Sequence, residues 1–236
     1  MFLGIEIGGT KLQLGVGRGD GEVLALQRHD VAPSLGASGI LRDIATSGAA
    51  LIERFDIRSA GVGFGGPVDR TKGQFTKSHQ IAGWDQFPFG EWFRTTLGIP
   101  VVLGNDCDSA ALAEALFGAG RGSSRIFYVT VGTGIGGGFV VDGKIEGTER
   151  PAIAEIGHLR PGPSHRSPTE TIESLASGWG IVALARERLE GWIARSTGVR
   201  SDGAAALTPI EIRQYLQGLG ETERGSEADL LIRCEG

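Results

Sequence analysis

Short apolar runs separated by glycine-rich turns recur along this chain. The runs are rich in β-branched and aromatic residues, a composition that is typical of buried or half-buried β-strands. The pattern predicts strands at Phe2–Ile7, Leu12–Val16, Glu22–Arg28, Ser59–Phe64, Pro100–Leu103, Ile126–Val131 and Phe139–Val141.

Other stretches carry apolar residues at the three- and four-residue spacing of an amphipathic helix. Residues 36–55 are the first example, with Ile40, Leu41, Ile44, Leu51, Ile52 and Phe55 at roughly this spacing. The further predicted helical segments are Ser109–Phe117, residues 169–178, Trp179–Ile193 and residues 208–217, where Thr208 is an N-cap and Pro209 lies in the first turn. Since strands and helices alternate, we interpret the fold as α/β.

Two of the predicted turns have a composition that suits phosphate binding. Gly132–Gly138 contains five glycines in seven positions. We expect a tight turn here rather than a helix or strand, because glycine loses the most backbone freedom on ordering. Without Cβ atoms, the amide N–H groups of such a turn can face one concavity that attracts phosphate. Taken alone, the run is more typical of an ordinary glycine-rich hairpin.

The second such turn is Gly8–Lys11, which joins the first two strands. It adds Thr10 and Lys11 to a Gly-Gly pair, and Lys11 could meet a phosphate. Glu6, just before the turn, could hold Mg²⁺ through water. Taken alone, Lys11 is more simply a solvated strand end, but two such turns in one chain favour phosphate binding.

Two more strand ends carry candidate chemistry. Gly65 and Gly66 break the strand that ends at Phe64, and a Gly-Gly break often lets a ligand approach the backbone. Asn105 and Asp106 lie between a predicted strand and a predicted helix. Both residue types cap helices well, but ligands of α/β proteins also bind at the carboxyl ends of strands. The spacing alone does not separate these two interpretations of Asn105 and Asp106.

The composition of the chain argues against nucleic-acid-binding, disulfide-rich and membrane-spanning proteins. The chain has 236 residues, a mass of 24.7 kDa and a net charge of −5, which argues weakly against a nucleic-acid or anionic-membrane partner. Its two cysteines, Cys107 and Cys234, make a disulfide framework implausible and indicate a reducing compartment. Met1–Ile5 leads directly into a strand without a signal sequence, and no apolar run approaches the ~20 residues of a membrane span. We therefore expect a cytoplasmic enzyme or binding protein.

Five of these segments, in this order, give the chain its resemblance to a known family. They are Glu6–Lys11, Gly61–Asp69, Asn105-Asp106 with the alanine-rich helix that follows, Gly132–Gly138, and Glu155-Ile156-Gly157-His158. Together they resemble the ROK family of sugar kinases and related repressors, over a range from Phe2 to about Gly178. The resemblance implies a two-lobed actin- and hexokinase-like fold, related to ribonuclease H, with mixed sheets and a central cleft. The expected lobes are residues 1–106 and 107–236.

The resemblance implies phosphorylation of a hexose at its 6-hydroxyl by ATP and Mg²⁺, with glucose as the best single candidate. Asp106 would accept the hydroxyl proton. The expected sugar contacts are Gly65, Gly66, Asn105, Glu155, His158 and Glu173. The expected contacts to ATP phosphates and Mg²⁺ are Glu6, Gly9, Thr10, Lys11, Thr133 and Gly134. A homodimer is common in the family, and neither nucleic acid nor membrane is an expected partner.

Three departures from the family pattern change these expectations. The family usually has Asp where this chain has Glu6. Many members carry a zinc site of one His and three Cys, but Pro161–Thr171 contains no Cys, so no zinc is expected. The family also runs about 60 residues further, so we expect the C-terminal lobe to lack an adenosine motif and a last helix. The alternative is a non-catalytic sugar-binding or regulatory protein, that is, a degenerate or truncated kinase, although the chain begins at its first strand without the helix-turn-helix of the repressors.

Overall fold

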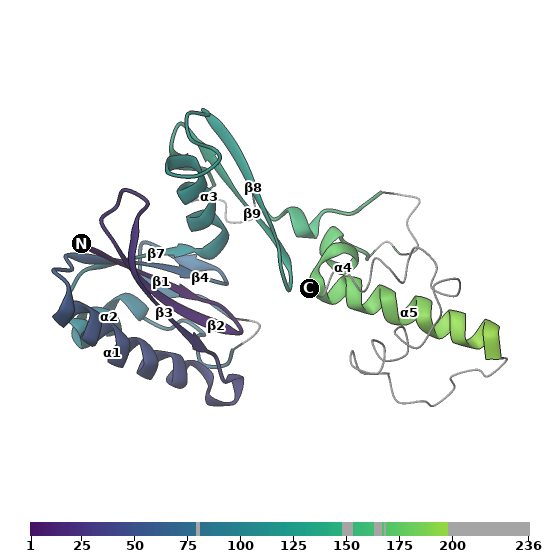
Figure 1. Cartoon of the computed structure of the whole chain (residues 1–236), viewed down its shortest axis with the longest axis horizontal. Helices are drawn as coiled ribbons and strands as arrows, with labels where there is room; N and C mark the ends of the chain where they lie inside the picture. Colours follow the sequence, from purple (N-terminus) through teal and green to yellow (C-terminus); the bar gives the residue numbers. More distant parts are fainter. Residues whose placement is uncertain (79–80, 148–152, 163–166, 168, 198–236) are drawn as a thin grey trace. The chain divides into compact units, whose positions relative to one another are not determined.

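The structure is a computed structural model that describes residues 1–78, 81–147, 153–162, 167 and 169–197 (Figure 1). The strands are β1 (Phe2–Ile7), β2 (Lys11–Gly17), β3 (Val23–Asp30), β4 (Ser59–Phe64), β5 (Val68–Asp69), β6 (Gln74–Phe75), β7 (Val101–Asn105), β8 (Arg125–Val131), β9 (Ile135–Val141) and β10 (Lys144–Ile145). The helices are α1 (Gly36–Arg54), α2 (Phe89–Leu97), α3 (Asp106–Leu116), α4 (Ile172–Ala176) and α5 (Gly178–Thr197), with short 3₁₀ turns at Pro33–Leu35 and Ile156–His158. The α/β interpretation is confirmed.

The chain forms two compact units. The first comprises Met1–Thr130 and Gly136–Ile156, and the second comprises Val131–Ile135 and Gly157–Gly236. The hairpin of β8 and β9 therefore has its strands mainly in the first unit and its tip in the second. The expected lobe boundary after residue 106 stays a prediction, because compact units need not coincide with the lobes of a hinged fold.

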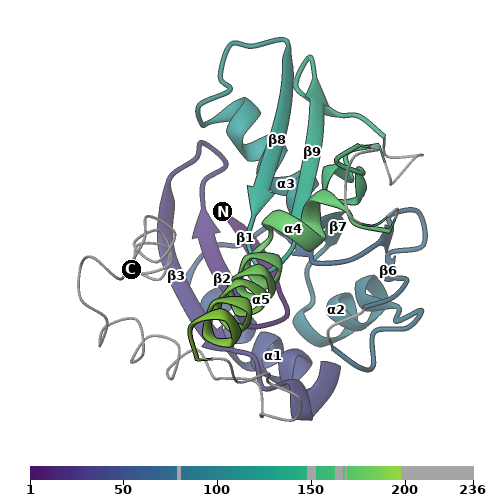
Figure 2. The same ribbon diagram turned by 90° about the vertical axis from the view of Figure 1, so that its right-hand side faces the viewer.

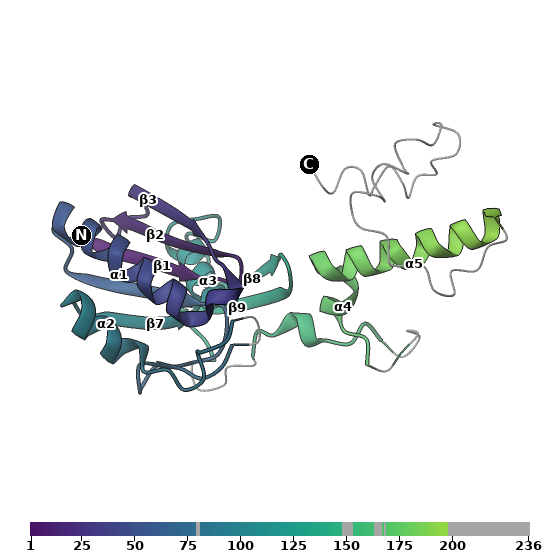
Figure 3. The same cartoon turned by 90° about the horizontal axis from the view of Figure 1, so that it is seen from below.

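The first unit is built on a mixed five-stranded sheet with the order β3-β2-β1-β4-β7. Strands β1, β2 and β3 pair antiparallel, whereas β4 is parallel to both β1 and β7. Alternate residues of β1 are buried, since Leu3, Ile5 and Ile7 are at most 3% exposed. Helices α1 and α2 cover this face of the sheet (Figures 1 and 3). The period-two alternation of β1 thus places the apolar core between the sheet and two helices.

The opposite face of the sheet carries several glycines in place of larger side chains. Gly4, Gly15 and Gly61 lie side by side in one row across β1, β2 and β4. This row lines a cavity, and α3 packs against the next row, where Gly63 of β4 lies opposite Gly104 of β7. A Cβ atom on Gly63 would lie 3.4 Å from the Asp106 Cα, and a Cβ atom on Gly104 would lie 3.0 Å from the Ser109 Oγ of α3. Because Gly63 and Gly104 lack side chains, α3 lies close to the sheet, and its first turn directly follows the end of β7.

The glycine run after β8 does not form one long turn as predicted. Only residues 132–134 turn, and Gly136, Gly137 and Gly138 lie within β9, beside β8 and β10 in a three-stranded sheet (Figure 2). A Cβ atom on Gly138 would lie 2.5 Å from the Ala111 Cβ of α3. Gly136 and Gly138 are therefore required by the close packing of α3, whereas a Cβ atom on Gly137 would lie 2.6 Å from the Ala154 carbonyl oxygen; none of the three is required by a turn.

The turn predicted at Asp142 and Gly143 is confirmed. It connects β9 to β10 with Val141 opposite Lys144, and the φ angles of its two residues are 48° and 73°. Two successive positive φ angles suit the two-residue hairpin that Asp-Gly favours.

The second unit contains α4 and α5 at the positions where helical segments were predicted (Figure 2). Thr171 and Ser174 form a capping box at the start of α4, and Ser177 caps α5 through a 3.2 Å bond from the Gly180 amide. The helix predicted at residues 208–217 and the tail after it lie outside the described residues. No helix in the described ranges has both the length and the apolar character required to span a bilayer.

Candidate active site

Asp106 is the first residue of α3 and follows β7 directly. Helix α3 begins three residues earlier than the predicted Ser109, because Asn105 caps it: the Asn105 Oδ1 accepts a 3.1 Å bond from the Asp108 amide. The capping interpretation of Asn105 is therefore confirmed. Because the cap uses only the side-chain oxygen, the amide nitrogen of Asn105 remains able to donate elsewhere.

The Asp106 carboxyl lies in a largely buried environment. Its Oδ1 accepts a 2.8 Å bond from the Cys107 amide, and a Cβ atom on Gly65 would lie 3.4 Å from its Oδ2. Burial raises the pKa of Asp106 above the ordinary value of 3.8, and the negative charge of Glu6 raises it further. A carboxylate with a raised pKa is a better proton acceptor at neutral pH, which is what a general base requires.

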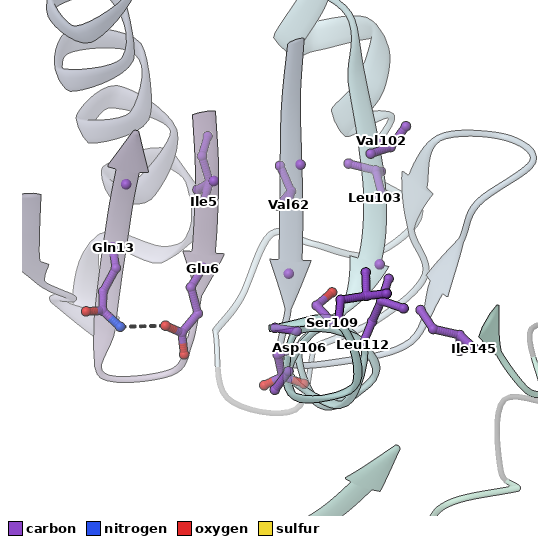
Figure 4. A pocket seen from close by; sticks show the side chains of 18 of the residues that line it. Ile5, Glu6, Gln13, Val62, Val102, Leu103, Asp106, Ser109, Leu112 and Ile145 are labelled. Carbon is purple, nitrogen blue, oxygen red and sulfur yellow. Dashed lines mark hydrogen bonds between the residues drawn. The ribbon is translucent and has the colours of Figure 1, made fainter. Parts of the chain in front are cut away.

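Glu6 is held on β1 by two neighbours across the sheet. Gln13 donates to the Glu6 Oε2 (Figure 4), and the Arg28 Nε donates to the Gln13 Oε1 at 2.8 Å. The register of β1, β2 and β3 places these three residues in one row. The sequence analysis missed Gln13 and Arg28, whose relation to Glu6 appears only once the hairpin register is known.

Glu6 and Asp106 line the same cavity of about 670 Å³, at the same end of it (Figure 4). Carboxylate oxygens are the protein ligands that Mg²⁺ prefers, and Mg²⁺ is usually bound by one or two carboxylates together with substrate phosphates. Two carboxylates on one cavity therefore fit the magnesium expected here. The described residues contain no cluster of three or more His, Cys, Asp or Glu that could bind a metal by itself.

The turn between β1 and β2 presents free backbone donors. It is closed by a 3.0 Å bond from the Gly8 amide to the Lys11 carbonyl, and the Thr10 carbonyl accepts from Val31 at 2.9 Å. The amides of Gly9 and Thr10 form no hydrogen bond within the described ranges. With the exposed Lys11 beside them, they can donate to an anion.

The two glycines after β4 have different surroundings. The Gly65 amide donates to the Ile7 carbonyl at 3.1 Å, which joins the ends of β4 and β1, and Gly65 faces Asp106. A Cβ atom on Gly66 would lie only 2.8 Å from the Lys77 carbonyl oxygen and 2.9 Å from a ring carbon of Phe64. Packing within the chain therefore explains Gly66, whereas Gly65 alone borders the candidate base.

Glu155 lies near the start of α3 and is exposed. Its negative charge contributes to the raised pKa of two groups there, Cys107 and Asp108, whose main cause is burial. The pKa of Cys107 reaches about 12, so this thiol stays protonated and unreactive at neutral pH. The first unit therefore brings Glu6, Gly65, Asn105, Asp106 and Glu155 to the region where β7 passes into α3.

The second unit contains the other glycine turn, which is fixed from both sides. The Gly132 carbonyl accepts a 2.8 Å bond from the Gly178 amide at the start of α5. The Glu173 Oε2 of α4 accepts a 2.8 Å bond from the Ile135 amide. The amides of Thr133 and Gly134 have no hydrogen-bond partner among the residues described, so the turn offers two donors to a phosphate.

Glu173 thus has a structural contact that the sequence analysis did not predict. A Cβ atom on Gly134 would lie 2.6 Å from the Glu173 Oε2, so glycine is required where the carboxylate reaches the turn. One carboxylate oxygen holds the turn, and the other has no hydrogen-bond partner among the described residues. His158 ends the short 3₁₀ turn in this unit and is exposed. The sugar contacts expected of Glu173 and His158 stay predictions.

The fold and these two sets of residues define the class of protein. The α/β fold with its mixed sheet is actin- and hexokinase-like, and it matches a ROK family glucokinase from Streptomyces griseus solved in complex with glucose and AMPPNP. That structure matches with a TM-score of 0.70 at 30% identity, over 93% of this chain and 65% of its own length.

The chain belongs to the ROK family, whose sequence profile matches residues 2–217. It is 31% identical to the glucokinase of Streptomyces coelicolor over 211 residues, which are 88% of this chain and 64% of that enzyme. It is 32% identical to the β-glucoside kinase of Listeria monocytogenes over 220 residues, which are 91% of this chain and 74% of that enzyme. A ROK family transcriptional regulator shares the fold at 20% identity, with a TM-score of 0.67. The chain thus spans just under two thirds of the Streptomyces coelicolor glucokinase.

Proposed function

We propose that this chain contributes the base and the phosphate-binding turns of an ATP-dependent sugar kinase that acts on the 6-hydroxyl of a hexose, with glucose the best candidate. The observation that carries the proposal is the position of Asp106, which is partly buried at the start of α3 and lines one cavity together with Glu6. The glucokinases and the β-glucoside kinase among its relatives support the reaction class.

In this mechanism the Asp106 carboxylate accepts the proton of the 6-hydroxyl while that oxygen attacks the terminal phosphorus of ATP; the bond from this phosphorus to the β-phosphate oxygen breaks, and ADP leaves. Phosphoryl transfer depends mainly on positioning and on electrostatic stabilisation, so the other residues bind and orient. The Asn105 amide nitrogen would fix a neighbouring hydroxyl, and Glu155, His158 and Glu173 would accept or donate to hydroxyls near the anomeric end. Gly65 would leave room for the sugar beside Asp106.

The phosphates would be bound by the free amides of Gly9, Thr10, Thr133 and Gly134 and by the Lys11 ammonium. Glu6 would hold Mg²⁺, which would offset the negative charge of the phosphates. Gln13 and Arg28 keep the Glu6 carboxylate facing this position.

The test compares Asp106→Asn with Asp108→Asn, which removes a neighbouring carboxylate from the same helical turn. A coupled assay measures turnover with ATP and glucose, and calorimetry measures glucose affinity. Asp106→Asn should lower turnover at least ~10²-fold with glucose affinity nearly kept, whereas Asp108→Asn should change turnover far less. Turnover of Asp106→Asn at the wild-type level would refute the assignment. Glucose binding without any wild-type turnover would favour a sugar-binding or regulatory protein.

The expected oligomeric state, cellular location and zinc content can each be measured directly. We propose a homodimer in the cytoplasm that folds without zinc. Light scattering coupled to size-exclusion chromatography measures the oligomeric state, and fractionation of cells measures the location. Stoichiometric zinc that survives dialysis against a chelator would show that the loop after His158 binds metal without cysteine.

A further inference from the structure

The carboxylate of Glu173 has two oxygens with different surroundings. The Glu173 Oε2 accepts a 2.8 Å bond from the amide of Ile135, the residue that directly follows the glycine turn of residues 132–134. The Glu173 Oε1 has no hydrogen-bond partner in the described part of the chain, and the side chain is half-buried. One side chain can therefore hold the turn with one oxygen and accept from a sugar hydroxyl with the other.

The start of α4, which carries Glu173, is fixed by hydrogen bonds on both of its sides. Thr171 and Ser174 exchange bonds of 2.9 Å and 3.2 Å in the capping box. The Ile172 amide donates to the Leu159 carbonyl at 2.9 Å, which joins α4 to the segment after His158. Because the backbone beside Glu173 is held in this way, the position of its carboxylate depends mainly on its own side-chain rotamer.

The short 3₁₀ turn that ends at His158 packs against the same place. Gly157 of this turn is buried, and a Cβ atom on it would overlap the Ile135 carbonyl oxygen and lie 3.3 Å from the Glu173 Cβ. Only glycine allows this approach. The two candidate sugar residues of the second unit, His158 and Glu173, therefore both lie next to the residue that follows the phosphate turn.

The carboxylate also lies close to the turn itself. A Cβ atom on Gly134 would lie 2.6 Å from the Glu173 Oε2, and the amides of Thr133 and Gly134 directly precede the Ile135 amide that this oxygen accepts from. Successive amides are joined through planar peptide groups, so fixing the Ile135 amide also restricts the directions of the two amides before it. The direction of the phosphate donors thus depends on whether the carboxylate is in place.

Two physical effects make a sugar at the Glu173 Oε1 favour a phosphate at the turn. Glutamate loses much rotamer freedom when it is ordered, and a hydroxyl that donates to Oε1 orders the carboxylate before the phosphate arrives. The carboxylate is also a negative charge beside a phosphate position, and a hydroxyl donor on Oε1 draws part of this charge away from the turn. Both effects have the same sign.

We propose that Glu173 is a positioning residue of the phosphate turn, through which the sugar and the phosphate donor bind with positive cooperativity. The inference rests on the proposed function, because it requires a sugar hydroxyl at Glu173 and a phosphate at the amides of Thr133 and Gly134. Coupling between two sites is reciprocal, so each ligand should raise the affinity of the other by the same factor, about fivefold or more, which is the lower end for coupled sites.

The experiment measures this factor by calorimetry on the full 236-residue chain. Glucose affinity is measured with and without saturating AMPPNP, a form of ATP that is not hydrolysed, and AMPPNP affinity is measured with and without glucose. Gly134→Ala is the main variant, because its Cβ atom displaces the flexible carboxylate and keeps every turn amide and Glu173 itself. The factor should disappear in Gly134→Ala. It should persist in Gly132→Ala, the matched control from the same turn, whose Cβ atom has no neighbour within 4 Å.

A second set of variants keeps the test valid if Gly134→Ala fails to fold. Glu173→Ala removes the acceptor of the Ile135 amide, so the factor should disappear. Glu173→Gln keeps a side-chain oxygen for this amide, so a measurable factor should return. Ser174→Ala weakens the start of α4 through its capping box but keeps the carboxylate, so the factor should persist. A merely structural role of Glu173 would instead lower both affinities and leave their coupling unchanged.

The possible results separate this inference from the proposed function. If the wild-type chain binds glucose and AMPPNP independently, the inference is overturned and the proposed function stands. If the wild-type chain fails to bind one of the two ligands, the matching half of the proposed function fails and the inference fails with it. Equal loss of the factor in Gly132→Ala and Gly134→Ala would also overturn the inference, because the cause would then be the turn and not the carboxylate. Loss in Gly134→Ala alone supports it.

Discussion

Replacing Gly138 by alanine would test why the glycine run after β8 exists. A Cβ atom at Gly138 would lie 2.5 Å from the Ala111 Cβ, 2.8 Å from the Cys107 carbonyl oxygen and 3.2 Å from the Asp108 Cα. All three atoms belong to α3, and two of them belong to its backbone. No side-chain rotation can relieve these contacts, so either α3 or β9 must move.

The size of the effect follows from this geometry. Overpacking a close-packed interior typically costs about 1–3 kcal/mol. A contact at 2.5 Å with the Ala111 Cβ, which cannot rotate away, and one at 2.8 Å with the Cys107 backbone oxygen favour the upper end, about 3 kcal/mol. For a domain of roughly 150–250 residues, each kcal/mol lowers the melting temperature by about 2–4 °C, so we expect a decrease of about 6–12 °C. Since α3 begins with Asp106, we also expect lower turnover.

Thermal unfolding followed by circular dichroism measures the effect, and Gly132→Ala is the matched control from the same glycine run. A Cβ atom on Gly132 has no neighbour within 4 Å, and its φ is not left-handed, so the control should stay within about 0.5 kcal/mol of wild type. The reasoning would be refuted if Gly138→Ala melted like the wild type. It would also be refuted if Gly132→Ala were as destabilising as Gly138→Ala.

Three further predictions follow from the same contacts. Glu173→Ala leaves the Ile135 amide without its acceptor, which destabilises the turn of residues 132–134 by about 1–3 kcal/mol. The turn amides should then bind phosphate less well, so calorimetry should show weaker tripolyphosphate binding. Unchanged binding would mean that Glu173 does not hold the turn. Because the folded-state pKa of Asp106 is raised, its contribution to stability is present at low pH and is lost as pH rises from the ordinary value of 3.8 through the folded-state pKa. Urea unfolding should therefore show Asp106→Asn gaining stability over wild type as pH rises, and a gain independent of pH would contradict this. Phe127 and Val129 are 47% and 44% exposed on β8, which is an edge strand of the described three-stranded sheet. Replacing both by lysine should therefore reduce self-association of the chain, measured by sedimentation. Unchanged self-association would mean that the contact between copies lies elsewhere.

Local patterns predicted the strands well where a single face is buried. Strands β1 and β4 have the predicted bounds, because each is an alternating or apolar run that ends at a Gly-Gly pair. Strand β9 begins four residues before the predicted Phe139, since its glycines look like a turn in any short window. Gly136 and Gly138 make room for α3, some 25–30 residues earlier in the chain, and Gly137 makes room for the Ala154 carbonyl; no local pattern contains either contact.

The candidate site, like the strands, has features that local sequence patterns predict and features that they do not. The junction at Asn105 and Asp106 could be predicted because capping and strand ends are local signals. The contacts that orient the site could not, because they join residues far apart in sequence. The bond from Ile135 to Glu173 spans 38 residues, and the bond from Arg28 to Gln13 depends on the register of a hairpin. Only the packed structure shows which carboxylate oxygens are already occupied.

Residues 132–138 contain glycines of two kinds, those that form a turn with available amides and those that let a helix pack closely against a strand. At residues 132–134, the turn offers the amides of Thr133 and Gly134, which have no partner in the described part of the chain. A few residues later, Gly136 and Gly138 make room for α3, whose first residue is the candidate base. Because β9 runs without interruption from the turn to the contact with α3, a single strand connects the two sites. Substitutions at the turn should then change donor affinity first, whereas substitutions in the strand should change stability and turnover together. A strand substitution that altered donor affinity alone would show that the two uses of glycine are not separate.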